Sequence, residues 1–363
     1  MGENFVVAPS SADPEGSAAK NSTPIRLLNL GLTESWRTQA VYHAVAELMH
    51  AEAPDTIIIC RPQTPYLCLG YHQVFDATFD RAECVRRNLP VFRRKLGGGA
   101  TYLDANQLFY QCVFHHRRVP VLLKALYQRM LAAPVAALRR LGLTAALCDL
   151  NEIEVAGKRI AGTGSGRLGE AAVVVGNFLF DFDYETMGRV WRVPGESFRL
   201  LALEAMKDRL VTLRQLGSFA VAAVEKILVE EFERTLGRPV LSGRLTAAEE
   251  ARSRELAAQM TSPAYLNLHR GHGEVEPQQE LKISANVFIR AAQTVCNGHV
   301  MCASVRVDHD CVAVARLESH PPQNWQKHEA AMAGMPFQGW QNFWESFFQV
   351  AAAIPPSGCN MVA

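Results

Sequence analysis

The hydrophobic positions along the chain predict short strands interrupted by a few longer helices. Val41, Val45 and Leu48 recur at helical spacing, which predicts an amphipathic helix over Glu34–His50 with its N-cap near Thr33. Short runs of β-branched and aromatic residues, punctuated by Pro, Gly and Asn, predict strands. The predicted strands are Arg26–Leu30, Thr56–Cys60, Tyr66–Leu69, Val91–Arg94, Ala100–Leu103, Leu108–Phe114, Ile153–Val155 and Ala171–Phe180, with a glycine-rich loop between the last two.

The pattern changes after a further set of predicted helices, which are Asp80–Asn88, Pro120–Leu141 and Val221–Leu236. Thr246–Met260 has the charged composition of an exposed connecting helix, and we place a domain boundary there. Beyond it we predict a small antiparallel sheet and two helices. The strands are Glu280–Arg290, His299–Val307 and Val312–Leu317, and the helices are Trp325–Met332 and Gly339–Ala352.

These elements indicate an α+β fold in which strands dominate. We expect four segments: a disordered tail over residues 1–23, a large domain over 24–240, a connecting segment over 241–275 and a small α+β domain over 276–363. In the last segment four aromatic residues at helical spacing predict a packing face that docks one domain on the other. They are Trp340, Phe343, Trp344 and Phe347.

Composition favours a packed protein and excludes several classes. The 363 residues are 48% hydrophobic and 20% charged, with a mean hydropathy of -0.02. A net charge of +1 leaves no cationic excess for a nucleic acid. No apolar run is long enough to cross a membrane and no secretory signal is evident, so we expect a cytoplasmic protein. The nine cysteines include no CxxC pair, so neither a disulfide framework nor a protein-held metal site is predicted.

The first chemically informative segment is Arg93–Asp104, with the sequence RRKLGGGATYLD. Three cations precede three consecutive glycines, Gly97–Gly99. Glycines let backbone N–H groups approach a ligand closely and form an anion-binding concavity, which suits a phosphate or a carboxylate. Composition alone leaves a second interpretation open, namely a flexible hairpin turn with exposed cations.

The second informative segment is Asn151–Gly164, with the sequence NEIEVAGKRIAGTG. It predicts a strand, a tight turn around Gly157, and then Lys158 and Arg159 on a strand that ends in another glycine-rich stretch. A charged surface pair is the alternative interpretation of these two cations.

The two segments, about sixty residues apart and in this order, resemble the motifs of the biotin/lipoate ligase and octanoyl transferase family. Leu69–Gln73, Gly176–Asp183 and Arg209–Leu213 resemble other parts of the same catalytic domain, so the likeness spans roughly Arg26–Leu216. Lys282–Ile289 and the strands after it resemble the accessory domain of lipoate ligases. The resemblance implies a mixed-sheet catalytic domain followed by a small α+β accessory domain.

The resemblance also implies an activity and a set of site residues. A ligase of this family joins lipoate or octanoate to ATP, which carries Mg²⁺, as an acyl-adenylate, and then transfers the acyl group to a lysine of a lipoyl carrier domain. The carrier would be a glycine cleavage H protein or a 2-oxoacid dehydrogenase E2. The substrate and ATP contacts implied are Arg94, Gly97, Gly98, Gly99, Ala100, Thr101, Tyr102, Asn151, Gly162 and Thr163.

One position departs from the family pattern. The catalytic lysine of the family directly precedes Ile-Ala-Gly, where this chain has Arg159, with Lys158 one residue earlier. Neighbouring side chains on a strand face opposite sides, so Lys158 replaces its neighbour only with a bulge or a register shift. Arg159 can steady an anion, but a planar fork is not equivalent to a lysine point charge. The resemblance therefore implies an altered catalytic cation, with a lowered or altered activity.

A different mechanism is open through Cys148. Octanoyl transferases and lipoyl amidotransferases of this fold place a nucleophilic cysteine shortly before the second motif, where this chain has Cys148. Such a thiolate needs nearby cations, which Arg94, Lys158 and Arg159 would supply if their loops converge. The alternative is a small structural cysteine at a strand end. A third hypothesis is a lipoyl- or carrier-binding homologue that has lost the chemistry.

Overall fold

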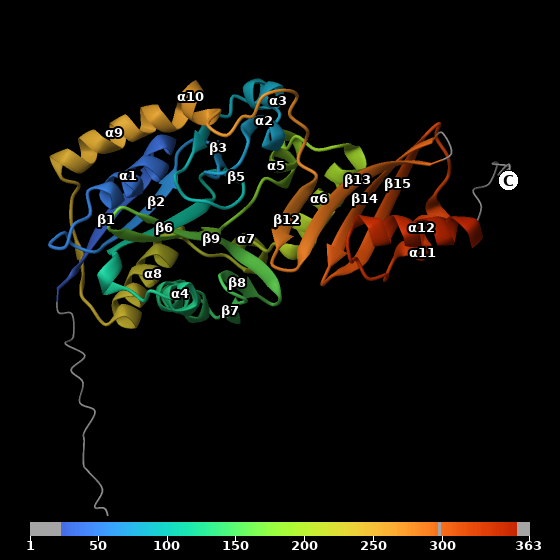
Figure 1. The fold of residues 1–363 in the computed structure, drawn as a ribbon. Coiled ribbons are helices and arrows are strands. Elements are labelled where there is room, and N and C mark those ends of the chain that lie inside the picture. Colours follow the sequence, from blue (N-terminus) through green and yellow to red (C-terminus); the bar gives the residue numbers. More distant parts are fainter. Residues whose placement is uncertain (1–22, 297–298, 354–363) are drawn as a thin grey trace, which may run out of the picture.

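A large mixed sheet forms the centre of the molecule (Figure 1). The computed structural model describes residues 23–296 and 299–353. Eight strands lie in the order β11-β1-β2-β6-β10-β9-β8-β7, with β1 parallel to both of its neighbours and the other pairs antiparallel. The strands are β1 (Ile25–Thr33), β2 (Thr56–Pro62), β6 (Gln107–His115), β7 (Ala145–Cys148), β8 (Glu152–Val155), β9 (Lys158–Leu168), β10 (Ala171–Leu179) and β11 (Val240–Ser242).

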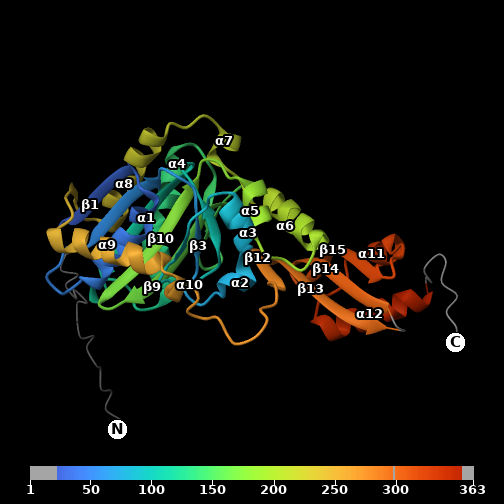
Figure 2. The ribbon, with the colours of Figure 1, turned by 90° about the horizontal axis from the view of Figure 1, so that it is seen from above.

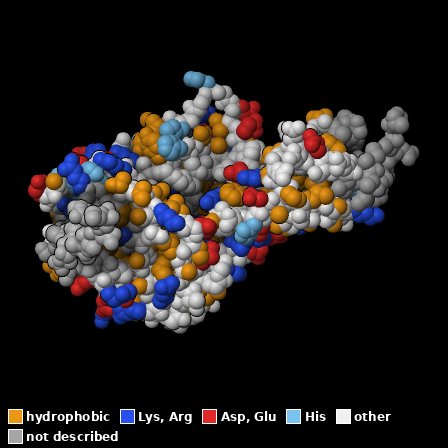
Figure 3. Space-filling model, turned by 60° about the horizontal axis from the view of Figure 1, so that its bottom comes forward, with side chains coloured by type: hydrophobic (Ala, Val, Ile, Leu, Met, Phe, Trp, Pro, Cys, Tyr) orange, Lys and Arg blue, Asp and Glu red, His pale blue; other side chains and the backbone are white. Residues whose placement is uncertain are grey.

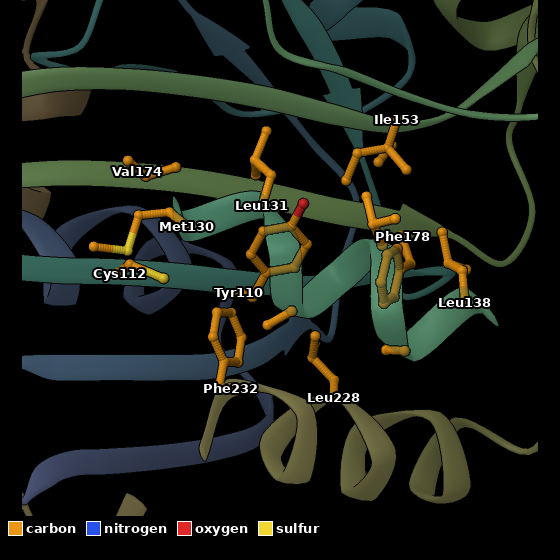
Figure 4. Close-up of a cluster of buried hydrophobic side chains, with 14 of the residues drawn as sticks. Tyr110, Cys112, Met130, Leu131, Leu138, Ile153, Val174, Phe178, Leu228 and Phe232 are labelled. Carbon is orange, nitrogen blue, oxygen red and sulfur yellow. The ribbon is translucent and has the colours of Figure 1, made fainter. Parts of the chain in front are cut away.

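One face of this sheet is covered by α4 (Leu123–Arg140) and α8 (Val221–Leu236). Figure 4 shows Tyr110 of β6 between these layers, close to Phe178 of β10 and Phe232 of α8. The ring centroids of Tyr110 lie 5.6 Å from Phe178 and 6.1 Å from Phe232. Gly176 makes room for this ring, because a Cβ there would lie 2.3 Å from the Tyr110 hydroxyl. This face is a filled apolar core.

The opposite face carries α1 (Ser35–Glu47) and a small second sheet, with α9 (Ala247–Thr261) packed across α1 (Figure 2). The prediction that this last helix is an exposed connector is wrong, because its Ser253, Leu256 and Met260 are buried. Glu249 also pairs with Arg26 at 2.5 Å. The second sheet has the order β4-β3-β5, with strands β3 (Tyr66–Leu69), β4 (Val91–Arg93) and β5 (Thr101–Leu103).

A separate antiparallel sheet, in the order β12-β13-β14-β15, forms the C-terminal body. One face packs on α6 (Glu196–Arg209), and α11 (Gln326–Met332) and α12 (Trp340–Ala353) cover the other. Phe343 and Phe347 of α12 are buried on this sheet, so the prediction that this aromatic face docks one domain on the other is wrong. The strands are β12 (Glu280–Ser284), β13 (Val287–Cys296), β14 (His299–Asp308) and β15 (Cys311–His320).

Apolar packing and ion pairs join the two bodies through α6. Phe198 and Leu201 of α6 share a core with Ile289 of β13. Around this core, Arg306 pairs with Asp208 at 2.6 Å and Arg209 with Asp308 at 3.3 Å. Charged side chains of both signs accordingly gather where the bodies meet (Figure 3). The C-terminal sheet is thereby held against the catalytic part of the chain.

Most predicted elements are present, with three differences. Residue Glu34, not Thr33, is the N-cap of α1, and its side chain makes no capping bond. The glycine-rich loop predicted before Ala171 is mostly strand β9. The predicted strand Glu280–Arg290 is two strands, β12 and β13. Elements without a prediction are β7, β11, α2 (Phe75–Thr78), α5 (Tyr184–Val190), α6, α7 (Leu213–Leu216) and α10 (Pro263–Leu266); Asp80–Asn88 contains α3 (Arg81–Arg86).

None of the helices within residues 23–296 and 299–353 combines the length and the apolar character needed to span a bilayer.

Candidate active site

The three glycines after β4 form a loop that wraps around the side chain of Arg94. Its Nη2 donates to the carbonyl oxygens of Gly97 and Gly99 at 2.7 Å, and its Nε donates to that of Gly97 at 3.1 Å. The N–H groups of Gly97, Gly98 and Gly99 donate to no acceptor in the described chain, and these glycines are exposed. A guanidinium beside unused backbone donors is a suitable place for an anion.

Next to the loop, Arg93 is fully buried, and among the described residues its guanidinium hydrogen-bonds to backbone carbonyls alone. Burial lowers the pKa of this guanidinium, and no carboxylate among the described residues pairs with it. Arg93 therefore fixes three chain segments to one another while leaving its positive charge uncompensated. The acceptors are the carbonyl oxygens of Gly70, Tyr71, Gln73, Tyr265 and Leu266, at 2.6 to 3.1 Å.

Helix α1 supports the same loop through His43. The buried ring donates from Nδ1 to the Gln39 carbonyl at 2.7 Å, and its Nε2 accepts from the Lys95 N–H at 3.0 Å. Burial lowers the pKa of His43 to about 3, so the ring is neutral and can act as this acceptor. The Lys95 ammonium in turn pairs with Glu47, which also pairs with Arg252 of α9 at 2.7 Å.

The turn after β3 lies against the loop. A Cβ on Gly70 would lie 1.9 Å from the Gly98 carbonyl oxygen, so only glycine allows this approach. The Tyr71 N–H donates to the Leu96 carbonyl at 3.0 Å. The resemblance of Leu69–Gln73 to a family segment thus has a structural counterpart, since this turn and the glycine loop form one wall.

Arg159, near the start of β9, enters the second wall of the site. Its Nε donates to the Ala161 carbonyl at 3.0 Å, its Nη1 donates to the Ile283 carbonyl of β12 at 3.3 Å, and Nη1 lies 3.8 Å from Glu152 Oε1. Glu152 is buried and its other oxygen, Oε2, has no partner in the structure. The Lys158 side chain is exposed and makes no hydrogen bond or ion pair within the described chain. The structure therefore brings Arg159, and not Lys158, beside Glu152.

Asn151 and Thr163 meet next to Arg159. The Thr163 hydroxyl donates to the Asn151 carbonyl. The neighbouring Gly162 N–H donates to Asn177 Oδ1 at 2.8 Å, and a Cβ on Gly162 would lie 3.7 Å from Arg159 Nη2. The same Cβ would lie 2.9 Å from Asn177 Oδ1, so glycine here makes room for the Asn177 amide, while the distance to Arg159 is an ordinary contact.

Side-chain amides connect this wall with the glycine loop. Asn177 Nδ2 donates to Gln107 Oε1 at 2.6 Å, and Gln107 Nε2 donates to the Tyr102 carbonyl at 3.1 Å. The Tyr102 ring is itself buried among apolar side chains, and burial raises its pKa. Ala100 and Thr101, partly exposed, connect Tyr102 to the glycines.

Cys148 ends β7, where it pairs with Glu152 of β8. Its thiol is half-buried. Burial and the carboxylates of Glu154, Asp149 and Glu152 raise the pKa of this thiol to about 11. The charged groups around Cys148 are therefore acidic.

Residues 34–233 match the family model of the lipoyl protein ligase A/B catalytic domain. The chain belongs to this family. Of two curated relatives of this chain, one is named a ligase and the other an octanoyltransferase. Lipoate-protein ligase A subunit 1 of Thermoplasma acidophilum is 26% identical over 198 residues, which are 52% of this chain and 75% of the relative. Octanoyltransferase LipM of Kyrpidia tusciae is 27% identical over 260 residues, which are 64% of this chain and 94% of the relative.

A solved structure confirms the fold of this lipoyl ligase-family chain. The bipartite lipoate protein ligase of Thermoplasma acidophilum, described with its E2 lipoyl domain, superposes with a TM-score of 0.63 at 24% identity. The superposition covers 70% of this chain and 99% of that one. The family and the mixed α+β fold predicted from the two motifs are thus confirmed, and the chain is an enzyme of the lipoate ligase and octanoyltransferase family.

Several supporting residues of the site carry no motif in the sequence. Arg93, His43, Gln107 and Asn177 act mainly on backbone groups, often of segments far away along the chain. Arg93 gave a signal as the first member of an Arg-Arg pair, and Asn177 lies in Gly176–Asp183, which resembles a segment of the family. His43 and Gln107 gave none. The predicted contacts Arg94, Gly97–Tyr102, Asn151, Gly162 and Thr163 belong to connected segments, and their role toward ligands stays a prediction.

Proposed function

We propose that the chain is an ATP-dependent lipoate-protein ligase, which activates lipoate or octanoate as an acyl-adenylate and transfers it to a lysine of a lipoyl carrier domain. The environment of Cys148 favours the ATP-dependent ligase over cysteine-dependent acyl transfer. Burial and the neighbouring carboxylates raise the pKa of this thiol to about 11, so the protonated thiol predominates at pH 7.5. A cysteine nucleophile needs neighbouring cations, and carboxylates surround Cys148 instead. The route without a cysteine is therefore favoured.

The residues of the two walls suit the charges of this reaction. Attack of the acid carboxylate on the α-phosphorus forms a P–O bond and expels pyrophosphate, so negative charge must be held on phosphate oxygens. The unused N–H groups of Gly97–Gly99 and the guanidiniums of Arg94 and Arg159 are the donors for it. In the second step the lysine amine attacks the acyl carbonyl and AMP leaves.

Magnesium would enter with ATP and neutralise phosphate charge. Residues 23–296 and 299–353 contain no group of three or more His, Cys, Asp or Glu that could hold a metal ion by themselves. The unpartnered Glu152 Oε2 offers one oxygen ligand, which fits a cation held chiefly by the phosphates of its substrate.

The acceptor we propose is a lipoyl domain of the 2-oxoacid dehydrogenase E2 type or a glycine cleavage H protein. The Thermoplasma ligase with the same fold is described together with its E2 lipoyl domain. That likeness supports the E2-type domain as the first carrier to test.

Intact-mass spectrometry of the carrier tests the proposal. One tube contains the protein, ATP-Mg, lipoate or octanoate, and an E2 lipoyl domain; a parallel tube contains octanoyl-carrier thioester without ATP. We expect a mass increase of one acyl group in the first tube, retained by Cys148→Ala. Modification only in the second tube, lost in Cys148→Ala, would instead establish cysteine-dependent octanoyl transfer.

The octanoyltransferase is the second candidate because LipM relatives match this chain over nearly their whole length. The place of Cys148 at the end of β7, opposite Glu152, also puts a thiol near the second wall. If neither tube yields modified carrier but the carrier binds saturably, the chain is a binding homologue without turnover.

A further inference from the structure

A one-way chain of buried amides crosses the sheet beneath the candidate site. Gly162 N–H donates to Asn177 Oδ1 at 2.8 Å, Asn177 Nδ2 donates to Gln107 Oε1 at 2.6 Å, and Gln107 Nε2 donates to the Tyr102 carbonyl at 3.1 Å. The Gln107 side chain is fully buried and Asn177 is 9% exposed. Four strands, β9, β10, β6 and β5, are joined by these three bonds.

The orientation of each amide is set by its neighbour. Because a backbone N–H can only donate, Asn177 must turn its oxygen toward Gly162 and its nitrogen toward Gln107. Gln107 must then present its oxygen to Asn177, which leaves its nitrogen for the Tyr102 carbonyl. A buried amide with a mismatched neighbour loses its hydrogen bond without compensation by water, so the chain has one stable arrangement.

Both ends of this chain lie in the site. At one end Gly162 lies beneath the Arg159 guanidinium and is followed by Thr163, which bonds to Asn151. At the other end Tyr102 closes the loop that contains Gly97–Gly99. The two walls come from different sheets, because β5 belongs to the small sheet and β9 to the large one.

We propose that Gln107 and Asn177 are positioning residues, which fix the distance between the glycine loop and the Arg159 wall so that one ligand contacts both. This inference rests on the proposed function, because it concerns the acid and the nucleotide that would lie between the walls. Neither side chain needs to touch them. Displacing one wall by about 1 Å can cost on the order of 100-fold in rate while the groups themselves stay present.

Strand β6 offers a matched control in Gln111. It is also a buried glutamine, four residues further along and on the same face of the strand, and its Nε2 donates to a backbone carbonyl, that of Thr38, at 2.6 Å. Thr38 lies in α1 and belongs to neither wall. Gln111→Leu removes one buried hydrogen bond away from the site, whereas Gln107→Leu removes two bonds that join its walls.

The experiment measures pyrophosphate release with ATP-Mg and octanoate in the absence of carrier, together with the melting temperature of each full-length variant. We expect Gln107→Leu to lower kcat about 100-fold and to lower the melting temperature more than Gln111→Leu does, because it loses two buried bonds and not one. The kcat of Gln111→Leu should stay within about threefold of that of the unmodified protein. Equal losses of kcat in the two variants, in step with their melting temperatures, would overturn the inference.

Gln107→Glu provides a second readout should Gln107→Leu fail to fold. A carboxylate keeps an acceptor for Asn177 but cannot donate to the Tyr102 carbonyl, whereas a protonated carboxyl can. Burial raises the pKa of such a carboxyl, so the ratio of variant to unmodified activity should rise as pH falls. Burial also raises the pKa of Asp104, which lies in the turn between β5 and β6. Dividing by the activity of the unmodified protein at each pH removes the contribution of Asp104 to the pH profile. A flat ratio would contradict a positioning role.

Failure of the proposed function can be distinguished from failure of the positioning role of Gln107 and Asn177. An unmodified protein that modifies carrier only from the thioester disproves the ATP route, and the same comparison of Gln107→Leu with Gln111→Leu is then made on that transfer. An unmodified protein inactive in both reactions overturns the inference together with the function.

Discussion

A Cβ atom on Gly70 would lie 1.9 Å from the carbonyl oxygen of Gly98. The turn after β3 and the glycine loop after β4 therefore touch through backbone atoms. No flexible side chain lies between them that could move aside if one segment gained bulk. Gly98 itself has a φ of +91°, a conformation that favours glycine. The shape of the loop is thus set by its neighbour as well as by its own residues.

Gly70→Ala should destabilise the protein by about 3 kcal/mol, because one backbone segment must move to admit the methyl group. Adenylate formation should fall more than stability predicts, since the loop is displaced. Gly271→Ala is the control, because nothing lies within 4 Å of its Cβ position, and its effect should stay below about 0.5 kcal/mol. Chemical denaturation measures both; equal free energies of unfolding for the two variants would contradict the contact.

Arg159→Met should lower the rate of acyl-adenylate formation by about 100-fold or more, because it removes a cation from the wall beside Glu152. Lys158→Met is the control, since this exposed side chain makes no bond within the described chain. Pyrophosphate release in single-turnover conditions separates this step from transfer. Comparable losses in the two variants would mean that the catalytic cation is Lys158 or that the cations act only through overall charge.

Periodicity in the sequence predicted the elements well where one face of an element is buried, and it missed the glycines of β9. Gly162, Gly164 and Gly166 were interpreted as a loop because glycine usually marks turns. On this strand, however, glycine admits close neighbours: a Cβ on Gly166 would lie 2.7 Å from Leu96, and one on Gly162 would lie 2.9 Å from Asn177. Such neighbours come from other parts of the chain, so the sequence near the glycines does not reveal them.

Helix α6 has no predicted counterpart although the sequence contains the helical hydrophobic pattern that would have indicated it. Phe198, Leu201, Ala202, Ala205 and Met206 are buried at helical spacing. The residues of the site also fall into two groups, those that the sequence indicates and those that only the fold reveals. Residues inside the two motifs could be predicted from resemblance, whereas His43 and Gln107 could not. Their partners include the Lys95 N–H and the Asn177 amide, which lie 52 and 70 residues away along the chain and which only the fold brings near.

His43 should make stability depend on pH. Its folded pKa of about 3 lies below the ordinary value of 6.5, so the unfolded chain binds a proton that the native chain does not. Stability is therefore complete above pH 6.5 and decreases as pH falls toward 3. The loss at pH 4.5 is on the order of 3 kcal/mol. His43→Gln lacks this titration, so the difference in unfolding free energy between the two proteins should shrink with acidification; a difference independent of pH would contradict a neutral buried ring.

Arg93→Met should be the most destabilising of these changes, by about 3 kcal/mol or more, because it removes the side-chain donor of five buried or part-buried carbonyl groups. Two of these carbonyls, those of Tyr265 and Leu266, lie at the C-terminal end of α10, where the helix supplies few donors; the Tyr265 carbonyl also accepts from the Leu268 N–H at 3.3 Å. Hydrogen exchange of residues 263–268 should therefore accelerate along with that of the glycine loop.

Arg139→Met is the control for this change, because Arg139 is exposed and donates to a single carbonyl, that of Ala145, at 2.8 Å. Its cost should stay below about 1 kcal/mol. Arg93→Lys adds a test of geometry: an ammonium keeps the charge but cannot reach carbonyls on both sides with a planar fork. It should therefore lose α10 protection while retaining more anion affinity than Arg93→Met. Unchanged exchange in residues 263–268 for both Arg93 variants would show that α10 is held by α9 alone.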